Sequence, residues 1–453
     1  PRSSAFLNHW LIGQTTEEIV AREVFSRFKS FVDYDAKPLS MPELLEKIHA
    51  ASIRYKEFID KGDVLEGAID RIGLFVYRTK AMDIEVVKPV LMALLDRDEN
   101  LQDVSDINAC LEILESWLIR RMLIRATTKS YNKVMTEVIK VIQKAPKGKL
   151  SEAIRAFFTS QTSDSSYWPD DNEVRSELFN LPIYRKIGRG RLRMVLESIE
   201  DYRRGWIGNE VSMSGVRVRR STYAIEHLMP QSWNRYWSAT DGYTEQDRNA
   251  RIHKLGNLTL LSNKLNSSVS NGPWDGEEGK RSSLLKRDVL FINRLITDDA
   301  GQVWDESKID RRTEDLIEDI LKIWPVPSGH QSSARTKKEV NSVKVGVEDL
   351  MSAGLLQAGQ VLHPKIAKFS DITAVILPDG SIGIGDNTFD TPSGAGKYVR
   401  KRATNGWGFW LLDQATKISL RDIRSQYLDQ LIGDGADIED DEDDDLDVAL
   451  EES

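Results

Sequence analysis

The residue types best suited to chemistry in this 453-residue chain lie between residues 223 and 271. Glu226 and His227 are adjacent there, and Asn257 and Asn266 follow them. A neutral imidazole can take a proton from an attacking water, and Mg²⁺ prefers oxygen ligands, with several waters retained. We therefore expect His227 to be a general base and Glu226 and Asn266 to hold a divalent cation. Asn257 is expected to orient the imidazole by accepting its second N–H.

Short elements are predicted to position these groups. Apolar neighbours indicate that the Glu226–His227 pair ends a strand, and Pro230 prevents that strand from pairing further. Residues 257–261 predict a second strand, with a bend at Gly256. Residues 262–269 have helix-compatible spacing and would carry Asn266 back toward the pair. Such a site suits in-line attack of water on a phosphodiester, because a metal ion can neutralise the charge that develops on the oxygens.

This stretch resembles the HNH (His-Me finger) nucleases, whose sites are ββα-metal units. The most similar pattern is that of the C-terminal nuclease domain of GmrSD-type, modification-dependent restriction enzymes. That pattern is I-E-H-x-x-P-Q, then L-G-N-L-T-L-L and a downstream Asn, and it appears here at 225–231, at 255–261 and at Asn266. The resemblance implies an HNH endonuclease that uses Mg²⁺ or Mn²⁺. Many HNH enzymes have His where this chain has Asn266, which leaves the preferred metal open.

Basic and aromatic residues supply candidate DNA contacts. The arginines just before residue 223 would hold phosphates beside the metal, or, with equal weight, would pair with nearby acids on a solvated face. His253 lies in the same segment but lacks a matching motif partner, so it is interpreted as a surface or packing histidine. The residues predicted to contact DNA are Arg217, Arg219, Arg220, Lys264, Trp407 and Trp410.

The composition bounds the class of protein. The net charge of −9 includes twelve acidic residues between 434 and 453, so the rest of the chain carries +3, which is compatible with DNA binding. We expect this tail to be a solvated, disordered segment; the alternative is a DNA mimic. Cys110 is the only cysteine, which excludes an internal disulfide and a Cys-cluster zinc site. The sequence shows neither a signal peptide nor an apolar run of membrane-spanning length, so a cytoplasmic protein is expected.

The first 145 residues predict amphipathic helices. Thr15 with Glu18 is expected to form a capping box that starts one of them, and Ser40-x-x-Glu43, with Pro42 in the first turn, is expected to start another. This part resembles the last helices of the ParB-like, nucleotide-hydrolysing domain that precedes the nuclease unit in GmrSD-type proteins. The D-G-Q-Q-R-type motif of that domain does not occur here, and Pro1 is not a natural start. We therefore expect a fragment or a processed form whose partner domain lies upstream.

The C-terminal third predicts a separate small domain. Its sequence indicates a helix at 347–353, two strands at 372–377 and 381–385 joined by an Asp-Gly turn, and a helix starting at 391–393. A last strand is expected from Asn405, with Trp407 and Phe409 on one face and Trp410 on the other. This succession resembles the RAMA (restriction-enzyme adenine-methylase-associated) domain, which is thought to sense DNA.

The sequence thus predicts a mainly α fold with a ββα-metal (HNH) nuclease unit, plus a small α+β C-terminal domain. The expected function is a metal-dependent DNA endonuclease of a restriction or anti-phage defence system, acting on modified DNA. The alternatives are a DNA-binding regulatory module with an inactive HNH site, or an RNA-cleaving toxin. The sequence leaves the modification and the oligomeric state open. The expected divisions are a helical domain at 1–145, the HNH domain at 146–324, a linker at 325–340, the RAMA-like domain at 341–430 and an acidic tail at 431–453.

Overall fold

The chain folds into two compact units, residues 1–334 and 335–453, which are considered one at a time. The structure is a computed structural model. It describes residues 2–36, 39–96, 103–207, 210–211, 215–235, 237, 243–262, 273–277, 279–287, 290–299, 303–332, 346–402, 404–414 and 416–432. None of the helices in these ranges is both long and apolar enough to cross a lipid bilayer.

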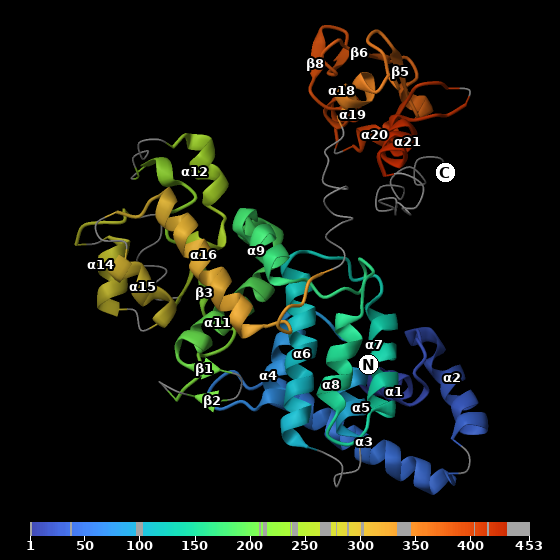
Figure 1. The fold of residues 1–453 in the computed structure, drawn as a ribbon, viewed down its shortest axis with the longest axis vertical. Helices are drawn as coiled ribbons and strands as arrows, with labels where there is room; N and C mark the ends of the chain where they lie inside the picture. Colours follow the sequence, from blue (N-terminus) through green and yellow to red (C-terminus); the bar gives the residue numbers. More distant parts are fainter. Residues whose placement is uncertain are drawn as a thin grey trace. The chain divides into compact units, whose positions relative to one another are not determined.

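In the described part of the first unit helices dominate, and four short strands lie among them (Figure 1). The helices before the candidate site are α1 (Arg2–Thr15), α2 (Val24–Ser30), α3 (Met41–Gly62), α4 (Arg71–Ala81), α5 (Lys88–Leu95), α6 (Val104–Leu123), α7 (Tyr131–Lys144), α8 (Leu150–Thr159), α9 (Asp171–Asn180), α10 (Ile183–Lys186) and α11 (Arg189–Arg203). The later elements are β1 (Trp206–Ile207), β2 (Glu210–Val211), β3 (Ala224–His227), α12 (Glu245–Arg251), β4 (Leu258–Leu261), α14 (Lys280–Arg287), α15 (Phe291–Asp299) and α16 (Glu306–Ile323).

The helix start predicted at Ser40 is confirmed, and the capping box predicted at Thr15 is wrong. Ser40 accepts from the backbone N–H of Glu43, whose carboxylate accepts in return from the Ser40 N–H, at the start of α3. Thr15 instead ends α1, and its hydroxyl donates to the carbonyl of Leu11 at 2.9 Å. Thr16 then takes a positive φ of 56°. The Thr-x-x-Glu spacing was misleading because the preceding residues already form a helix that the sequence did not reveal.

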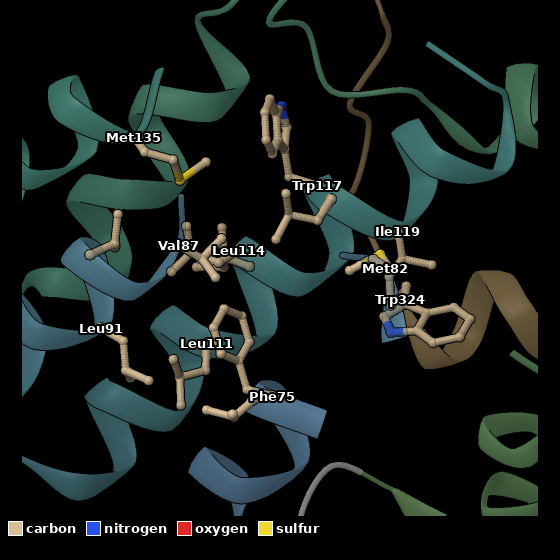
Figure 2. Packing of buried hydrophobic residues seen from close by; sticks show 14 of the residues in the cluster. Phe75, Met82, Val87, Leu91, Leu111, Leu114, Trp117, Ile119, Met135 and Trp324 are labelled. Carbon is tan, nitrogen blue, oxygen red and sulfur yellow. The ribbon is translucent and has the colours of Figure 1, made fainter. Parts of the chain in front are cut away.

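The larger of two hydrophobic core clusters in the first unit extends from the N-terminal helices to α16 and crosses the domain boundary expected at 145/146. Figure 2 shows Trp324, from just after α16, among core side chains of the N-terminal helices. The Trp324 indole N–H donates to the buried carboxylate of Glu115 on α6 at 2.8 Å. Burial alone would raise the pKa of Glu115, but Arg71 and Arg78 pair with it and hold that pKa below its ordinary value. The helical part and the region around the candidate site are therefore packed as one body.

Strands β3 and β4 form the antiparallel pair on which the candidate site is built. Ala224 faces Leu261 and His227 faces Leu258 in the register. Figure 1 shows β3 next to α11, which contacts both strands. Just before β4, α16 packs so closely that a Cβ on Gly256 would lie 2.0 Å from the carbonyl oxygen of Ile309. The glycine predicted to allow a bend is therefore needed for close helix packing.

The first part of the expected 325–340 linker is bound to the first unit. The Ser116 hydroxyl donates to the carbonyl of Pro325 at 2.7 Å. Further along, the Ser332 N–H donates to Asp170 at 3.0 Å, and the His330 ring lies 2.8 Å from the Trp168 carbonyl. Residues 325–332 thus belong to the packed body, and 333–345 lie outside the described residues.

The second unit has a five-stranded antiparallel sheet in the order β8-β7-β6-β5-β9 with its own core. Its elements are α18 (Val347–Ser352), β5 (Val361–Pro364), β6 (Ala374–Ile376), β7 (Ile382–Ile384), β8 (Asn387–Phe389), α19 (Pro392–Arg400), α20 (Gly406–Phe409), β9 (Trp410–Leu411) and α21 (Leu420–Ile432). The predicted Asp-Gly hairpin is confirmed, with Gly380 at φ 82° between β6 and β7. Thr391 caps α19 as predicted.

The strand predicted from Asn405 is wrong in its first half. Asn405 instead caps the short helix α20, and β9 begins only at Trp410. The expected alternation of faces therefore fails. Trp410 is fully buried and its indole N–H donates to the Pro392 carbonyl at 3.1 Å, so its ring is not available to a base. Trp407 is half-buried, with the Arg424 guanidinium 4.9 Å from its ring centroid.

The buried His9 predicts a pH-dependent stability of the N-terminal helices. Its Nδ1 lies 3.0 Å from the Tyr55 hydroxyl, and burial, followed by the charge of Lys88, lowers its pKa from 6.5 to about 4. As the pH falls below 6.5, the unfolded chain binds a proton that the folded chain refuses, so protonation favours unfolding. Between about pH 6.5 and 5, the unfavourable protonation of His9 should lower the free energy of unfolding by about 2 kcal/mol.

The measurement is urea unfolding of the wild type and of His9→Gln at both pH values. The variant should lose less stability on acidification, because the other buried histidines contribute equally to both proteins. An equal loss in the two proteins would show that His9 is not the responsible group.

Candidate active site

The end of β3 places His227 in a largely buried position, with only 4 % of the residue exposed. Alternate side chains of a strand point to opposite faces. Accordingly, His227 contacts one set of partners and Glu226 another. The strand is fixed at its start by Arg193 of α11, whose Nε donates to the Tyr223 carbonyl at 2.7 Å. The adjacent acid–His pair therefore presents its two side chains on different sides of the hairpin.

His227 is paired with a second histidine. Its Nε2 lies 3.3 Å from Nδ1 of His253, which is also buried. Tyr184 of α10 packs edge-on against His227 and stacks on His253, with ring centroids 4.2 and 5.8 Å apart, respectively. The Tyr184 backbone N–H also donates to the His253 carbonyl at 3.1 Å. When His227 donates through Nε2, its Nδ1 keeps the lone pair that a general base needs.

The surroundings keep both imidazoles neutral. Burial, followed by the charges of His253 and Lys280, lowers the pKa of His227 to about 3. The exposed Arg185 and Arg189 lower it further and also lower the pKa of His253, after the main effect of burial. Bound anions would offset these two arginines and raise the His227 pKa again. The pair thus forms a neutral proton acceptor beside two solvent-facing cations.

Lys280 occupies the other side of the hairpin. Its ammonium donates to Glu226 Oε1 at 2.9 Å and to the backbone carbonyl of His227 at 2.6 Å, while only 2 % of the residue is exposed. Burial lowers the pKa of Lys280, and the charge of Glu226 opposes that shift. Lys280 thus ties the carboxylate to the strand end that carries His227. It follows Glu226 by 54 residues, so no local spacing could have revealed it.

Comparison with known protein families gives a match for two segments of the chain. Residues 168–319 match the family described as GmrSD restriction endonucleases, C-terminal domain, and residues 327–432 match Restriction Enzyme Adenine Methylase Associated (RAMA). The chain carries a GmrSD C-terminal domain followed by a RAMA domain. No curated protein matches the chain. The resemblance predicted from the motifs is confirmed, and the match supports a restriction-type endonuclease.

Within the GmrSD domain, Asn257 does not contact the imidazole as predicted. Its side chain is fully buried, and its Oδ1 accepts from the Met229 N–H at 2.9 Å and from the Trp304 indole at 3.2 Å. Its Nδ2 donates to the carbonyls of Met229 and Ile252, both at 2.9 Å. Both the oxygen and the nitrogen of the Asn257 amide are thus fully hydrogen-bonded, and they join the segments that carry Met229, Ile252 and Trp304. The contact predicted for Asn257 is made instead by His253, which sequence reasoning took for a surface or packing residue.

Two of the arginines predicted to bind DNA are internal to the GmrSD domain and its helical neighbours. Arg217 is 5 % exposed and donates to Asp201 at 3.1 Å. Arg220 is 1 % exposed, and its Nε donates to the Val64 carbonyl at 2.8 Å. Both brace the segment that leads into β3, because a buried guanidinium requires fixed acceptors. Arg219 is exposed and pairs with Glu66. Arg185 and Arg189 are the exposed arginines beside His227.

Asn266 and Lys264 lie outside the described residues, as does nearly all of the helix expected at 262–269. The roles predicted for them, and the third element of a ββα unit, therefore stay predictions. Within the described ranges, no group of three or more His, Cys, Asp or Glu side chains could hold a metal ion. Glu226 remains about one-fifth exposed, at 19 % of its side chain, and Lys280 engages one of its oxygens. One carboxylate, an amide and retained waters is a donor set of the kind that Mg²⁺ accepts.

Replacement of Asn257 should test whether it is structural. Asn257→Ala leaves four buried polar groups without partners and should lower the free energy of unfolding by about 2–4 kcal/mol. Urea unfolding followed by tryptophan fluorescence measures this loss. The matched control is Asn249→Ala, because the exposed Asn249 accepts a single hydrogen bond among the described residues, from the Trp233 indole at 3.0 Å. A stable but inactive Asn257→Ala protein would restore the catalytic assignment.

Proposed function

We propose that the chain is a metal-dependent DNA endonuclease in which His227 is the general base of an HNH-type site. The observation that supports this proposal is the His227–His253 contact, 3.3 Å between ring nitrogens, at the end of a β3 strand within the region that matches the restriction endonucleases. A hydrolase needs a neutral base that is held in one orientation. His253 and Tyr184 hold the imidazole, and burial keeps it neutral.

The substrate would approach from the side of the exposed cations. Arg185 and Arg189 are positioned to contact phosphates next to His227, and their contacts would make binding sensitive to salt. A bound phosphate would also offset the charges that depress the His227 pKa, bringing its basicity closer to neutral pH. Substrate binding would in this way prepare the base for the water that it must deprotonate.

Glu226 and Asn266 are the residues that would hold Mg²⁺ or Mn²⁺. The ion would supply positive charge for the phosphoryl and leaving oxygens. Lys280 would position the Glu226 carboxylate, since its ammonium joins that carboxylate to the His227 carbonyl. The alternatives are an inactive, DNA-binding regulatory module and an RNA-cleaving toxin. The intact pair of histidines favours an enzyme, and parallel assays on DNA and RNA separate the two polymers.

The His227→Ala substitution should lower the cleavage rate by about 10² to 10⁴, because the general base is lost. Nicking of modified and unmodified plasmid DNA with Mg²⁺ measures the rate, and DNA affinity measured in EDTA should stay within about twofold of wild type. The control is His49→Ala, which removes an exposed histidine of α3 and should leave cleavage unchanged.

Cleavage by His227→Ala within a few-fold of the wild-type rate would rule out this residue as the base. Wild-type cleavage that persists in EDTA would contradict the metal requirement separately. Cleavage of RNA alone would favour the toxin alternative.

We further propose that the RAMA domain confers preference for modified DNA. Deleting residues 341–453 should leave metal-dependent nicking but bring the ratio of rates on matched modified and unmodified DNA close to one. The deletion also removes the twelve acidic residues of the tail, whose loss alone raises nonspecific DNA affinity. Deleting only 434–453 controls for that effect at fixed salt. If the larger deletion keeps the full preference, recognition lies elsewhere.

A further inference from the structure

A pocket of about 480 Å³ lies where the α4–α5 connection, the turn after α6 and the α10–α11 segment meet. We infer that this pocket binds a nucleotide, with the base against its apolar wall and the phosphate at its cationic rim. Its volume falls within the range of small-molecule sites in proteins. The pocket is separate from the His227 site, and neither the family match nor the proposed catalytic role assigns it a ligand.

The wall of the pocket suits a planar base. Ile84, Val86 and Met122 line it and are partly exposed, so they present apolar surface to a ligand. Met82 and Ile187 also line it and are buried, so packing on the core holds this part of the wall in place. An apolar wall with a few polar groups nearby is typical of sites for small molecules.

The rim of the pocket carries three exposed cations, Arg125, Lys186 and Arg191. None of the three forms an ion pair with a carboxylate in the part of the chain that the structure describes. Two acids also line the pocket, but Glu85 is paired with Lys88, which leaves Asp83 against three cations. The net positive rim suits a phosphate, to which a guanidinium can bond through two N–H groups.

The backbone at the rim allows a conservative test of the cation. Arg125 follows the end of α6 at φ 59°. Glycine is the favoured residue at such a helix end, because a Cβ is strained there. Replacing Arg125 by glycine therefore removes the cation without straining the fold.

The pocket and the candidate active site share helix α10. Lys186 lines the pocket, and Tyr184, two residues earlier on the same helix, contacts both His227 and His253. A single strand bound along α10 would therefore reach both sites. This source of the nucleotide, a unit of the polynucleotide substrate, rests on the function proposed above. A free nucleotide is the other source with the same chemistry.

Isothermal titration calorimetry on the full chain tests the inference. The probes are a deoxynucleoside 5′-monophosphate and a single-stranded 12-mer, both in EDTA, so that the measurement does not depend on cleavage. Arg125→Gly removes a rim cation and the backbone strain together. Thr128→Trp fills the pocket from an exposed position and leaves every charge in place. Lys417→Gly is the matched control, because Lys417 is an exposed cation at φ 57° that does not line the pocket.

We expect the wild type to bind the monophosphate saturably, and Arg125→Gly to weaken binding about tenfold, the usual effect of one lost charged hydrogen bond. Arg125→Gly should have a Tm no lower than wild type, which separates lost binding from lost folding. Thr128→Trp should reduce binding by at least as much, and Lys417→Gly by less than twofold. If the same variants also weaken binding of the 12-mer, the bound nucleotide is a unit of a strand. If they weaken binding of the monophosphate alone, the ligand is a free nucleotide.

Absence of saturable binding of both probes would overturn the inference. So would binding that falls with Arg125→Gly but not with Thr128→Trp, because surface charge alone would then explain it. These results are distinct from the failure of the proposed function, since inactive DNA cleavage would leave nucleotide binding in EDTA unchanged.

Discussion

The position of His227 depends on how α16 holds the segment before β4. Arg312 of α16 donates to the carbonyls of Gly256 and Leu258 at 2.6 and 2.7 Å, and the Gly256 N–H donates to the Thr313 hydroxyl at 3.0 Å. Burial lowers the pKa of Arg312 to about 9, so the guanidinium stays charged at neutral pH. Because Leu258 faces His227 in the register, this contact fixes the strand end that carries the imidazole.

The cationic side chains near the site serve two different purposes, and burial separates them. Arg217, Arg220 and Arg312 are buried and donate to fixed acceptors, which a desolvated guanidinium requires. Arg185 and Arg189 are exposed, and their charges lower the pKa of the buried histidines. Arginine therefore stabilises the framework where it is buried, and it faces solvent beside the histidines where it is exposed. A count of arginines along the sequence cannot distinguish the two.

The sequence predicted local structure correctly where residues close together in the chain determine it. Ser40 with Glu43, Thr391 before Pro392, and the Asp379–Gly380 turn all act within four residues, and all three appear as expected. Predictions failed where a distant segment intervenes. Thr15 does not cap a helix, because it is the last residue of α1. Asn405 caps the short helix α20 where a strand was expected. In the Asn405 segment, the packing of the core that buries Trp410 determines where the strand begins.

The sequence by itself determined the motif types and the family. The Ile-Glu-His and Gly-Asn-Leu-Thr-Leu-Leu segments predicted two paired strands with His227 at the end of one, and the family match covers both. Only the tertiary structure decided which side chains meet there. His253 lies 26 residues from His227, and Lys280 lies 53 residues from it. Residues so far apart in the sequence meet only because the helices between them pack in one arrangement. The length of the intervening chain permits many possible contacts, and the packing of the core selects one of them.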